Sequence, residues 1–261
     1  MTPRQQVLDG LAADPGRSGL FTDFDGTLSP IVADPESAAP LPAALSALGR
    51  LAPQLQKVAV VSGRPARFLA RHFDGAAVDL YGLHGLEHWS GGDAEPAAEA
   101  APYAAAVHSA VAFAIKAGLD GLDVEDKGLA LTLHWRRAAE GEKAAAAGAE
   151  LAGQLAQRFG LVARPGKASV ELLPPVGIDK GSVVTREGAG LAAACFLGDD
   201  AGDLAAFRAL DALEAGGARV FRIGVDSTEA PPELLAAADL VLDGPKAAAG
   251  LLEDLADRLG G

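Results

Sequence analysis

The sequence predicts an α/β protein, in which a Rossmann-like parallel sheet with helices on both faces is interrupted by a smaller α+β domain. The first observation is that short apolar runs alternate with amphipathic helical patterns over both ends of the chain. The second is that the middle of the chain follows a different order, a helix and two strands repeated twice. The length of 261 residues suits a domain that carries one insertion.

Six short apolar runs are predicted to be buried strands, because each is rich in aliphatic or aromatic residues and ends near Gly, Asp or Ser. They span residues 18–24, 57–63, 77–82, 193–200, 218–224 and 238–244. Amphipathic patterns predict helices at residues 40–54, 64–73, 179–190, 201–215 and 245–260. Because strand and helix alternate along the chain, the strands are expected to lie parallel.

The middle of the chain is predicted to fold as a unit of its own. A helix is expected at 103–117, a hairpin with strands 122–128 and 130–136, a second helix at 137–159 and two further strands within 161–174. The acidic, Gly- and Pro-containing stretch 90–102 is interpreted as a linker, and 173–177 as the return. These limits predict a core of residues 1–100 and 174–261 and an inserted domain of residues 101–173.

Composition narrows the range of partners. The net charge of −13 and the absence of a basic cluster argue against nucleic acid or an anionic membrane as a partner, while a small anionic substrate remains compatible. No apolar run is long enough to span a bilayer, and residues 1–19 lack the pattern of a signal peptide. The single cysteine, Cys195, is interpreted as a small buried residue in a cytoplasmic protein. A monomer is the expected state.

Three predicted strands end in polar residues that could meet at one edge of the sheet. In an open parallel sheet, ligands bind beyond the carboxyl ends of the strands. The first strand ends in Asp23 and Asp25, and the second in Ser62 and Arg64. A later strand ends in Asp199, Asp200 and, one helical turn on, Asp203. We therefore expect up to five carboxylates, a hydroxyl and a cation to lie together.

Such a carboxylate cluster would repel itself by roughly several kcal/mol unless it were neutralised. Oxygen ligands without cysteine or paired histidines favour a hard cation, and Mg²⁺ is the expected one. The predicted metal ligands are Asp23, Asp25, Asp199, Asp200 and Asp203. Helix caps and turn residues are the alternative interpretation, which suits Asp200 well.

The same residues can be assigned roles in phosphoryl transfer. A carboxylate can attack phosphorus and form an aspartyl-phosphate, and Asp23 at the strand tip suits this nucleophile. Asp25, two residues further on, suits the acid and base. The Ser62 hydroxyl and nearby backbone N–H groups could hold a phosphate, and Lys180 could supply positive charge.

The segments DFDGTLSP, VVSGR, the lysine Lys180 and GDDAGD resemble, in this order, the four motifs of the haloacid-dehalogenase-like (HAD) phosphatases. The resemblance extends over nearly the whole chain. It implies that the core has the HAD fold and that Asp23, Asp25, Ser62 and Lys180 are the catalytic residues.

Segments of the insertion resemble those of trehalose-6-phosphate phosphatases: GLHG at 82–85, VEDKG at 124–128, LHWR at 133–136, Gly166-Lys167 and VEL at 170–172. In that family the insertion is a cap that closes over the disaccharide. The resemblance implies Mg²⁺-dependent hydrolysis of trehalose 6-phosphate, with substrate-binding residues Arg64, Glu125, Lys127, Arg136, Lys167 and Glu171. A phosphatase for another sugar phosphate (a glycosyl-phosphoglycerate or a hexose phosphate) and a non-catalytic sugar-phosphate sensor are the alternatives.

Residue spacing in the insertion agrees with a polar sheet surface. Glu125 and Lys127 are two residues apart, so they share one face of a strand, and Lys167, Ser169 and Glu171 are expected to do the same. A sugar needs both donors and acceptors, which acids and amines supply. Cross-strand ion pairs on exposed faces would produce the same pattern. His84 and His134 are assigned no chemistry.

The last motif departs from the pattern of the family. The family often has GDDxTDE, whereas here Gly202 and Leu204 replace the Thr and the Glu. The three aspartates of the motif are retained, so metal binding is still expected. The two replacements are expected to change contacts next to the metal, and they weaken the match to the substrate of the family.

Overall fold

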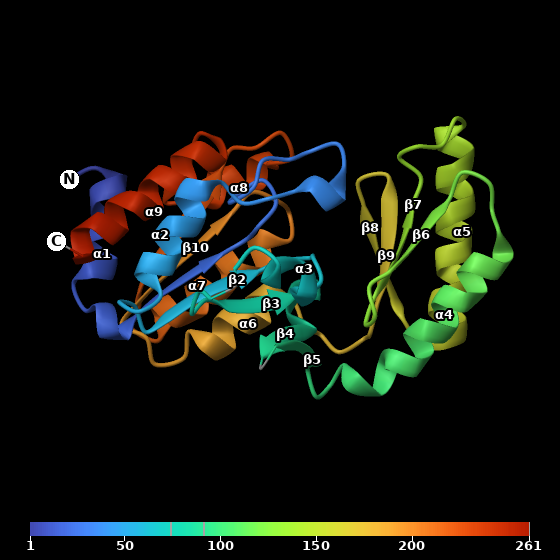
Figure 1. Ribbon diagram of the computed structural model, residues 1–261, viewed down its shortest axis with the longest axis horizontal. Coiled ribbons are helices and arrows are strands. Elements are labelled where there is room, and N and C mark those ends of the chain that lie inside the picture. Colours follow the sequence, from blue (N-terminus) through green and yellow to red (C-terminus); the bar gives the residue numbers. More distant parts are fainter. Residues whose placement is uncertain (74, 91, 261) are drawn as a thin grey trace. The chain divides into compact units, whose positions relative to one another are not determined.

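The computed structural model describes residues 1–73, 75–90 and 92–260. The chain divides into two compact units (Figure 1): unit 1 comprises Met1–Ala94 and Ile178–Gly261, and unit 2 comprises Glu95–Gly177. The predicted boundaries, after residues 100 and 173, differ from these by a few residues. That residues 101–173 form an inserted cap stays a prediction.

An eight-stranded sheet in the described part of the chain forms the centre of unit 1, in the order β12-β11-β10-β1-β2-β3-β4-β5. All pairs from β12 to β3 are parallel, and β4 is antiparallel to β3. The predicted α/β class is thereby confirmed. The strands are β1 Ser18–Thr22, β2 Lys57–Val61, β3 Asp79–Gly82, β4 Glu87–Ser90, β5 Asp93–Pro96, β10 Ala193–Gly198, β11 Arg219–Val225 and β12 Leu240–Leu242.

The linker predicted at residues 90–102 is wrong in part, because β5 (Asp93–Pro96) and a 3₁₀ turn (Ala101–Tyr103) lie within it. β5 extends the sheet beside β4. Backbone hydrogen bonding to a neighbouring strand creates this element, although its sequence, DAEP, has no strand-forming residues. The sequence pattern therefore could not indicate it.

Helices cover both faces of this sheet, as predicted (Figure 1). Alternate strand residues point to opposite faces, so Leu20 joins one core cluster and Phe21 the other. α1, α2, α3 and α9 contribute to the first cluster, and α6, α7 and α8 to the second. Their bounds are α1 Pro3–Ala12, α2 Pro42–Leu51, α3 Ala66–Ala70, α6 Lys180–Glu187, α7 Asp203–Ala215, α8 Pro232–Ala237 and α9 Gly244–Gly260. The predicted helices did not include α1 or α8.

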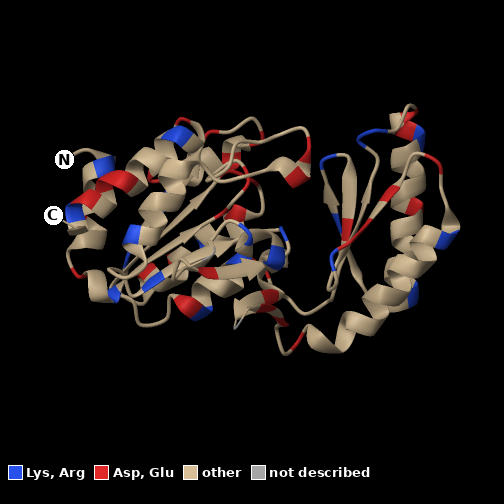
Figure 2. Cartoon of the chain, viewed as in Figure 1, with Lys and Arg blue, Asp and Glu red and all other residues tan. Residues whose placement is uncertain are grey.

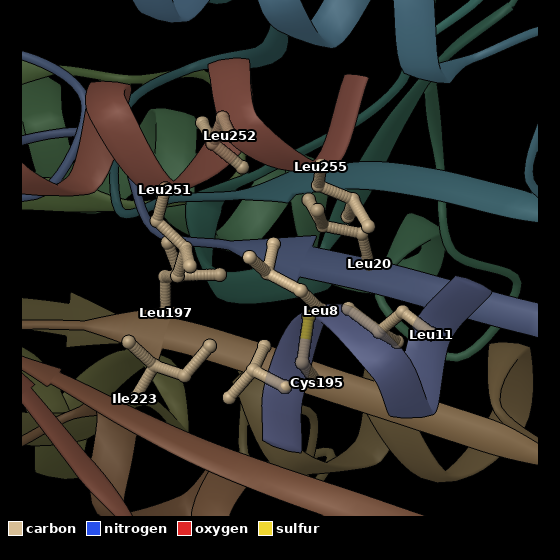
Figure 3. A pocket seen from close by; sticks show the side chains of 10 residues that line it. Leu8, Leu11, Leu20, Cys195, Leu197, Ile223, Leu251, Leu252 and Leu255 are labelled. Atoms are coloured by element: carbon tan, nitrogen blue, oxygen red, sulfur yellow. The ribbon is translucent and has the colours of Figure 1, made fainter. Parts of the chain in front are cut away.

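Cys195 lies at the centre of the first cluster (Figure 3), where its side chain is enclosed by leucines of α1, α9 and neighbouring strands. It is fully buried, and burial raises the pKa of its thiol to about 12. An inert thiol in an apolar environment is the small buried residue that the sequence predicted.

Unit 2 contains a four-stranded antiparallel sheet in the order β6-β7-β9-β8, with α4 and α5 packed against it through one apolar cluster. The strands are β6 Asp123–Asp126, β7 Leu131–His134, β8 Val162–Gly166 and β9 Ser169–Leu173. The helices are α4 Ala104–Ala117 and α5 Gly141–Phe159. Both helices end at a glycine in the left-handed conformation, Gly118 and Gly160.

Short 3₁₀ turns complete the described elements: η1 Pro15–Arg17, η2 Pro35–Ser37, η3 Leu83–Gly85 and η4 Ala101–Tyr103. Among the described residues, no helix is both long and apolar enough to cross a membrane.

Candidate active site

The candidate site lies at the carboxyl ends of three adjacent strands of unit 1. β1 pairs with β10 on one side and with β2 on the other, all in parallel. Asp23 follows β1, Ser62 follows β2 and Asp199 follows β10, and all three residues are buried. The topology therefore brings together residues that are 39 to 176 positions apart in the chain.

Lys180 lies within this group as the first residue of α6 and is 2% exposed. Its Nζ is 2.8 Å from Asp23 Oδ1 and 2.7 Å from Asp203 Oδ1. Burial lowers the pKa of Lys180, but the carboxylates of Asp200, Asp203 and Asp23 outweigh burial and hold this pKa well above its ordinary value. The side chain is therefore a fixed ammonium beside the candidate nucleophile.

The pKa of the Asp23 carboxyl is raised well above its usual range, because burial and the nearby Asp200 and Asp199 outweigh the attraction of Lys180. Asp23 is also fixed in position, since its backbone N–H donates to the Leu197 carbonyl at 2.8 Å. The cluster thus holds more negative charge than its one ammonium can balance.

Asp199 is fixed by two hydroxyl groups. Thr27 Oγ1 donates to Asp199 Oδ1 at 3.2 Å, and Ser227 Oγ donates to Oδ2 at 2.6 Å. Gly26 packs so closely against this carboxylate that a Cβ at position 26 would clash with it. Ser227 was missed by the sequence analysis because it follows β11, which carries no other motif residue; its position beyond a strand end was the available signal.

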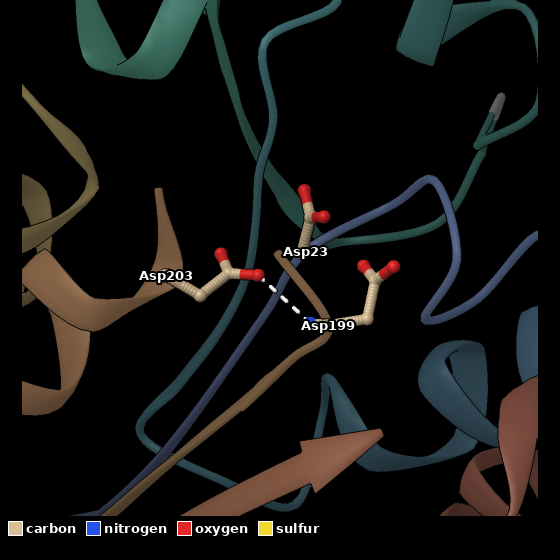
Figure 4. Close-up of side chains that lie close together, drawn as sticks. All are labelled: Asp23, Asp199 and Asp203. Carbon is tan, nitrogen blue, oxygen red and sulfur yellow. Dashed lines mark hydrogen bonds between the residues drawn. The ribbon is translucent and has the colours of Figure 1, made fainter. Parts of the chain in front are cut away.

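Asp203 is fully buried, and both of its carboxylate oxygens accept hydrogen bonds, of which Figure 4 shows the one from the Asp199 backbone. Oδ1 accepts from Lys180 Nζ at 2.7 Å, while Oδ2 accepts from the backbone N–H groups of Asp199 at 2.9 Å and Asp200 at 3.0 Å. These contacts shape the turn that carries Asp199. Asp203 therefore orders the cluster, and its direct binding to a metal stays a prediction.

The two residues that depart from the family pattern flank this turn. Gly202 precedes α7, and Leu204 packs against the second core cluster. Asp200 Oδ1 accepts a hydrogen bond from the Asp203 N–H at 3.1 Å. The turn is thus closed by the aspartates themselves, without a side chain at position 202.

The Asp25 side chain pairs with Arg64 and not with Lys180. Arg64 Nε donates to Asp25 Oδ2 at 2.7 Å, and Arg64 Nη2 donates to Oδ1 at 2.9 Å. The guanidinium also lies over the Phe68 ring, 4.7 Å from its centroid. Two parallel hydrogen bonds and a stacked ring hold the candidate acid and the candidate phosphate-binding arginine in one arrangement.

A left-handed turn supports the Ser62 loop. Leu83 and His84 have φ angles of 50° and 61°, which are unfavourable for residues other than glycine. The His84 N–H donates to the Ser62 carbonyl at 2.8 Å, and the Leu83 N–H donates to the Arg64 carbonyl at 2.9 Å. The imidazole of His84 packs against Gly63. Burial raises the pKa of Asp200, but the charge of Lys180 and, to a lesser extent, His84 outweigh burial, so that this pKa lies below its ordinary value. No pattern in the sequence indicated this role.

The arrangement fits a hard divalent cation. One carboxylate oxygen each from Asp23, Asp199 and Asp203 lies within 4.8 Å of the others. Burial, and then the neighbouring Asp203 and Asp200, raise the pKa of Asp199 to about 7 against the opposing hydrogen bond from Ser227. A cation would relieve this excess of negative charge, and oxygen donors are the ligands that such cations prefer.

In unit 2, one face of the sheet carries the residues predicted to contact a sugar. Lys127 Nζ is 2.9 Å from Glu171 Oε1 and 3.9 Å from Glu125 Oε2, and His134 Nε2 lies 2.8 Å from Glu125 Oε2. Figure 2 marks acidic and basic segments on these strands. Arg136 is exposed in the turn that follows β7. The structure thus contains the cross-strand ion pairs that the sequence left open as an alternative.

The predicted position of Lys167 on a strand is wrong. Lys167 and Ala168 form the two-residue turn between β8 and β9, and Ala168 has a φ of 54°. Lys167 is therefore exposed at the tip of a hairpin instead of sharing the strand face with Ser169 and Glu171.

The chain is similar to known proteins of one family. A family model described as "Trehalose-phosphatase" matches residues 21–236. The "Trehalose-phosphate phosphatase" of Mycolicibacterium paratuberculosis is 35% identical over 266 residues, which cover 96% of this chain and 64% of that protein. That of Mycobacterium tuberculosis H37Rv is 32% identical over 77% of this chain and 53% of that protein. The chain thus spans less than two thirds of the length of these relatives.

Solved structures agree in fold. The C-terminal domain of the Candida albicans trehalose-6-phosphate phosphatase superposes with a TM-score of 0.75 at 23% identity, covering 97% of both chains. The trehalose-6-phosphate phosphatase of Aspergillus fumigatus has a TM-score of 0.64 at 27% identity, again covering 97% of both chains.

Proposed function

Because the chain belongs to the trehalose-phosphatase family, we propose that it hydrolyses trehalose 6-phosphate to trehalose and phosphate, as a step of trehalose biosynthesis. The observation that carries the proposal is the buried pair of Asp23 and Lys180 beside Asp199 in unit 1. A binding protein without turnover would have no need to bury a carboxylate nucleophile against an ammonium, at the energetic cost of desolvating both.

In the first half of the proposed reaction, an Asp23 oxygen attacks phosphorus. A bond forms between that oxygen and phosphorus, and the bond between phosphorus and the sugar oxygen breaks. Asp25 donates a proton to the departing sugar oxygen, so that trehalose leaves as a neutral molecule. In the second half, Asp25 takes a proton from a water molecule that attacks the aspartyl-phosphate, which releases phosphate and restores Asp23.

Other groups of unit 1 would position the phosphate. The Lys180 ammonium lies next to the Asp23 oxygen, where the phosphoryl charge would come, and Ser62 lies at the neighbouring strand end. Arg64 donates two hydrogen bonds to the Asp25 carboxylate. An arriving phosphate would offer Arg64 a second anionic partner, and release of Asp25 from Arg64 would let it act as an acid.

The carboxylates of Asp23 and Asp199, with the Asp25 backbone carbonyl, are the groups proposed to hold a divalent cation. Asp200 and Asp203 are the remaining candidates in the same turn. A bound cation, which we propose to be Mg²⁺, would screen the negative charge of these carboxylates and of the phosphate.

Unit 2 is proposed to act as the cap that recognises the disaccharide. Glu125, Lys127 and Glu171 provide acceptors and donors on one face of its sheet, and Lys167 and Arg136 are proposed to reach the substrate from turns. We also propose a cytoplasmic location, where a phosphorylated sugar is available and Cys195 stays reduced.

A phosphate-release assay on the purified chain tests the proposal. Trehalose 6-phosphate, glucose 6-phosphate, a glycosyl-phosphoglycerate and p-nitrophenyl phosphate would each be assayed with added Mg²⁺ and with EDTA. We expect kcat/KM for trehalose 6-phosphate to exceed that for glucose 6-phosphate by about 100-fold or more, since buried polar groups in such a site discriminate strongly. Activity is expected to disappear in EDTA and return with Mg²⁺.

Two results would argue against the proposal. Equal kcat/KM on glucose 6-phosphate and trehalose 6-phosphate would reject recognition of a disaccharide and leave a general sugar phosphatase. Binding of trehalose 6-phosphate without release of phosphate from any substrate would indicate a sensor.

A further inference from the structure

One threonine of unit 2, Thr132, occupies a central position on the sheet face away from the helices. On β7, Leu131 and Leu133 pack into the apolar cluster with α4 and α5, so the side chain of Thr132 points to the opposite face. Its cross-strand neighbours there are Glu125 on β6 and Glu171 on β9. Thr132 thus lies between two of the residues proposed to contact the sugar.

The hydroxyl of Thr132 is buried and has no hydrogen-bond partner, although the residue is only 3% exposed. In the described ranges, only one other buried side-chain atom lacks a hydrogen bond, and that atom, His88 Nε2, faces the Asp79 carboxylate at 3.6 Å. The other buried serine and threonine hydroxyl groups of those ranges all have partners: Ser18, Thr22, Thr27, Ser29 and Ser62. An unpaired buried hydroxyl lowers the stability of the folded chain, and such groups in native proteins usually have a partner. Among the described residues, the folded chain provides no partner for Thr132.

The neighbouring carboxylates do not provide that partner. Glu171 Oε1 accepts from Lys127 Nζ at 2.9 Å, and Glu125 Oε2 lies 2.8 Å from His134 Nε2. Lys127 contacts carboxylates on both sides of Thr132, so its side chain extends across the row in which the hydroxyl lies. The two acids are directed toward Lys127 and His134, so a group from outside the chain would reach the buried hydroxyl between them only when the Lys127 side chain moves aside.

Chemistry and position indicate what such a group is. A threonine hydroxyl can donate one hydrogen bond and accept up to two, and a sugar hydroxyl can do the same. A valine would have the same shape, favour a strand as well and avoid the unpaired hydroxyl. We propose that Thr132 Oγ1 hydrogen-bonds a hydroxyl group of the sugar and helps to determine specificity for the disaccharide. This inference rests on the proposed function of unit 2.

The test compares Thr132→Val with Thr132→Ser in the full chain. Val removes the hydroxyl and keeps the shape, whereas Ser keeps the hydroxyl. We expect T132V to lower kcat/KM for trehalose 6-phosphate by about tenfold, since one neutral hydrogen bond contributes that much, while T132S stays within about threefold. Neither variant should change kcat/KM for p-nitrophenyl phosphate, which has no sugar hydroxyl.

Thermal unfolding without substrate provides a second measurement. T132V is expected to raise Tm, because it removes an unpaired buried hydroxyl, and therefore to separate stability from recognition. In the Asp23→Asn background, trehalose 6-phosphate should raise the Tm of T132V less than that of T132S.

Two outcomes overturn the inference. If T132V raises Tm but leaves the ratio of kcat/KM for trehalose 6-phosphate to that for p-nitrophenyl phosphate unchanged, Thr132 is a packing residue or pairs with water. If wild-type protein releases phosphate from p-nitrophenyl phosphate but not from trehalose 6-phosphate, the proposed substrate fails and this inference fails with it. The first result leaves the proposed function intact, so the two failures are distinguishable.

Discussion

The two units each contain a lysine among carboxylates, but the two lysines differ in their surroundings. In unit 1, Lys180 is 2% exposed and contacts Asp23 and Asp203, whose side chains are 5% and 0% exposed. In unit 2, Lys127 is 13% exposed and contacts Glu171 and Glu125, whose side chains are 15% and 42% exposed. Lys180, Asp23 and Asp203 are thus closed to water, although the side chain of Asp200, 3.9 Å from Lys180, is 46% exposed. The second cluster lies partly in solvent.

This difference indicates a division of labour. Buried charges interact strongly and cannot be replaced without leaving a partner unpaired, which suits groups that must be placed to a fraction of an ångström for chemistry. Partly exposed charges can exchange one hydrogen-bond partner for another at small cost, which suits recognition of a polar ligand. Changes in unit 1 should therefore affect every substrate, and changes in unit 2 should affect only those with a sugar.

The largest expected effect is that of Asp23→Asn. If Asp23 is the nucleophile, as proposed, its loss should lower kcat by about 10⁴-fold or more on trehalose 6-phosphate and on p-nitrophenyl phosphate alike. The exposed Asp243→Asn is the matched control and should retain full activity on both. Circular dichroism would establish that both variants are folded. Activity of D23N near the wild-type level on either substrate would refute its role as nucleophile.

Stability in the absence of metal should depend on pH through the Asp199 carboxyl. The pKa of Asp199 is raised from 3.8 to about 7, so between these values the folded state keeps a proton that the unfolded state releases. The stabilising contribution of Asp199 is therefore fully present below pH 4 and is lost as the pH rises through 7. The free energy of unfolding should fall by about 4 kcal/mol at most over this range. In EDTA, Asp199→Asn should become more stable relative to wild type as the pH rises from 4.5 to 7.5.

Urea unfolding of both proteins at the two pH values measures this difference, and Mg²⁺ should reduce it by neutralising the carboxylate. A difference that stays constant with pH would contradict the raised pKa. The partly exposed carboxylates of unit 2 should show no comparable dependence on Mg²⁺.

A smaller effect is expected from the close packing at Gly26. Gly26 and Gly75 have φ angles of 73° and 75°, but a Cβ would meet the Asp199 carboxylate at position 26 and no atom within 4 Å at position 75. Gly75→Ala should cost about 1 to 2 kcal/mol from backbone strain alone. Gly26→Ala should cost roughly 2 kcal/mol more, because Asp199 must move, and should also lower kcat. Equal free energies of unfolding for the two variants would show that Asp199 is not tightly held.

The smallest expected effect distinguishes the two units most directly. Lys127→Ala should lower kcat/KM for trehalose 6-phosphate by about tenfold, because a charged donor is lost, and leave p-nitrophenyl phosphate within about twofold. Lys143→Ala is the matched control, since Lys143 is 81% exposed on α5 and pairs only with Glu140 at 3.2 Å among the interactions described for it. An equal loss on both substrates would assign Lys127 to the chemistry or to stability rather than to recognition.

Much of unit 1 could be predicted because periodicity and strand ends carry the information. The alternation of apolar strands and amphipathic helices gave the parallel sheet, and Asp23, Ser62 and Asp199 each directly follow a strand. Elements formed by tertiary contact alone were missed: β5 has no strand-forming composition, and Ser227 belongs to no motif. In unit 2, a two-residue turn moved Lys167 off the strand, because turn geometry sets register and periodicity does not.

The sequence by itself determined the α/β class, which strands end in polar residues and the types of residue available for the proposed phosphoryl transfer. Tertiary structure alone decided how each residue is used. Asp25 pairs with Arg64, Asp203 is occupied by Lys180 and two backbone N–H groups, and Thr132 is left without a partner. The physical reason is that charge, burial and hydrogen bonding depend on neighbours distant in the chain, whereas a sequence pattern reports only on residues a few positions apart.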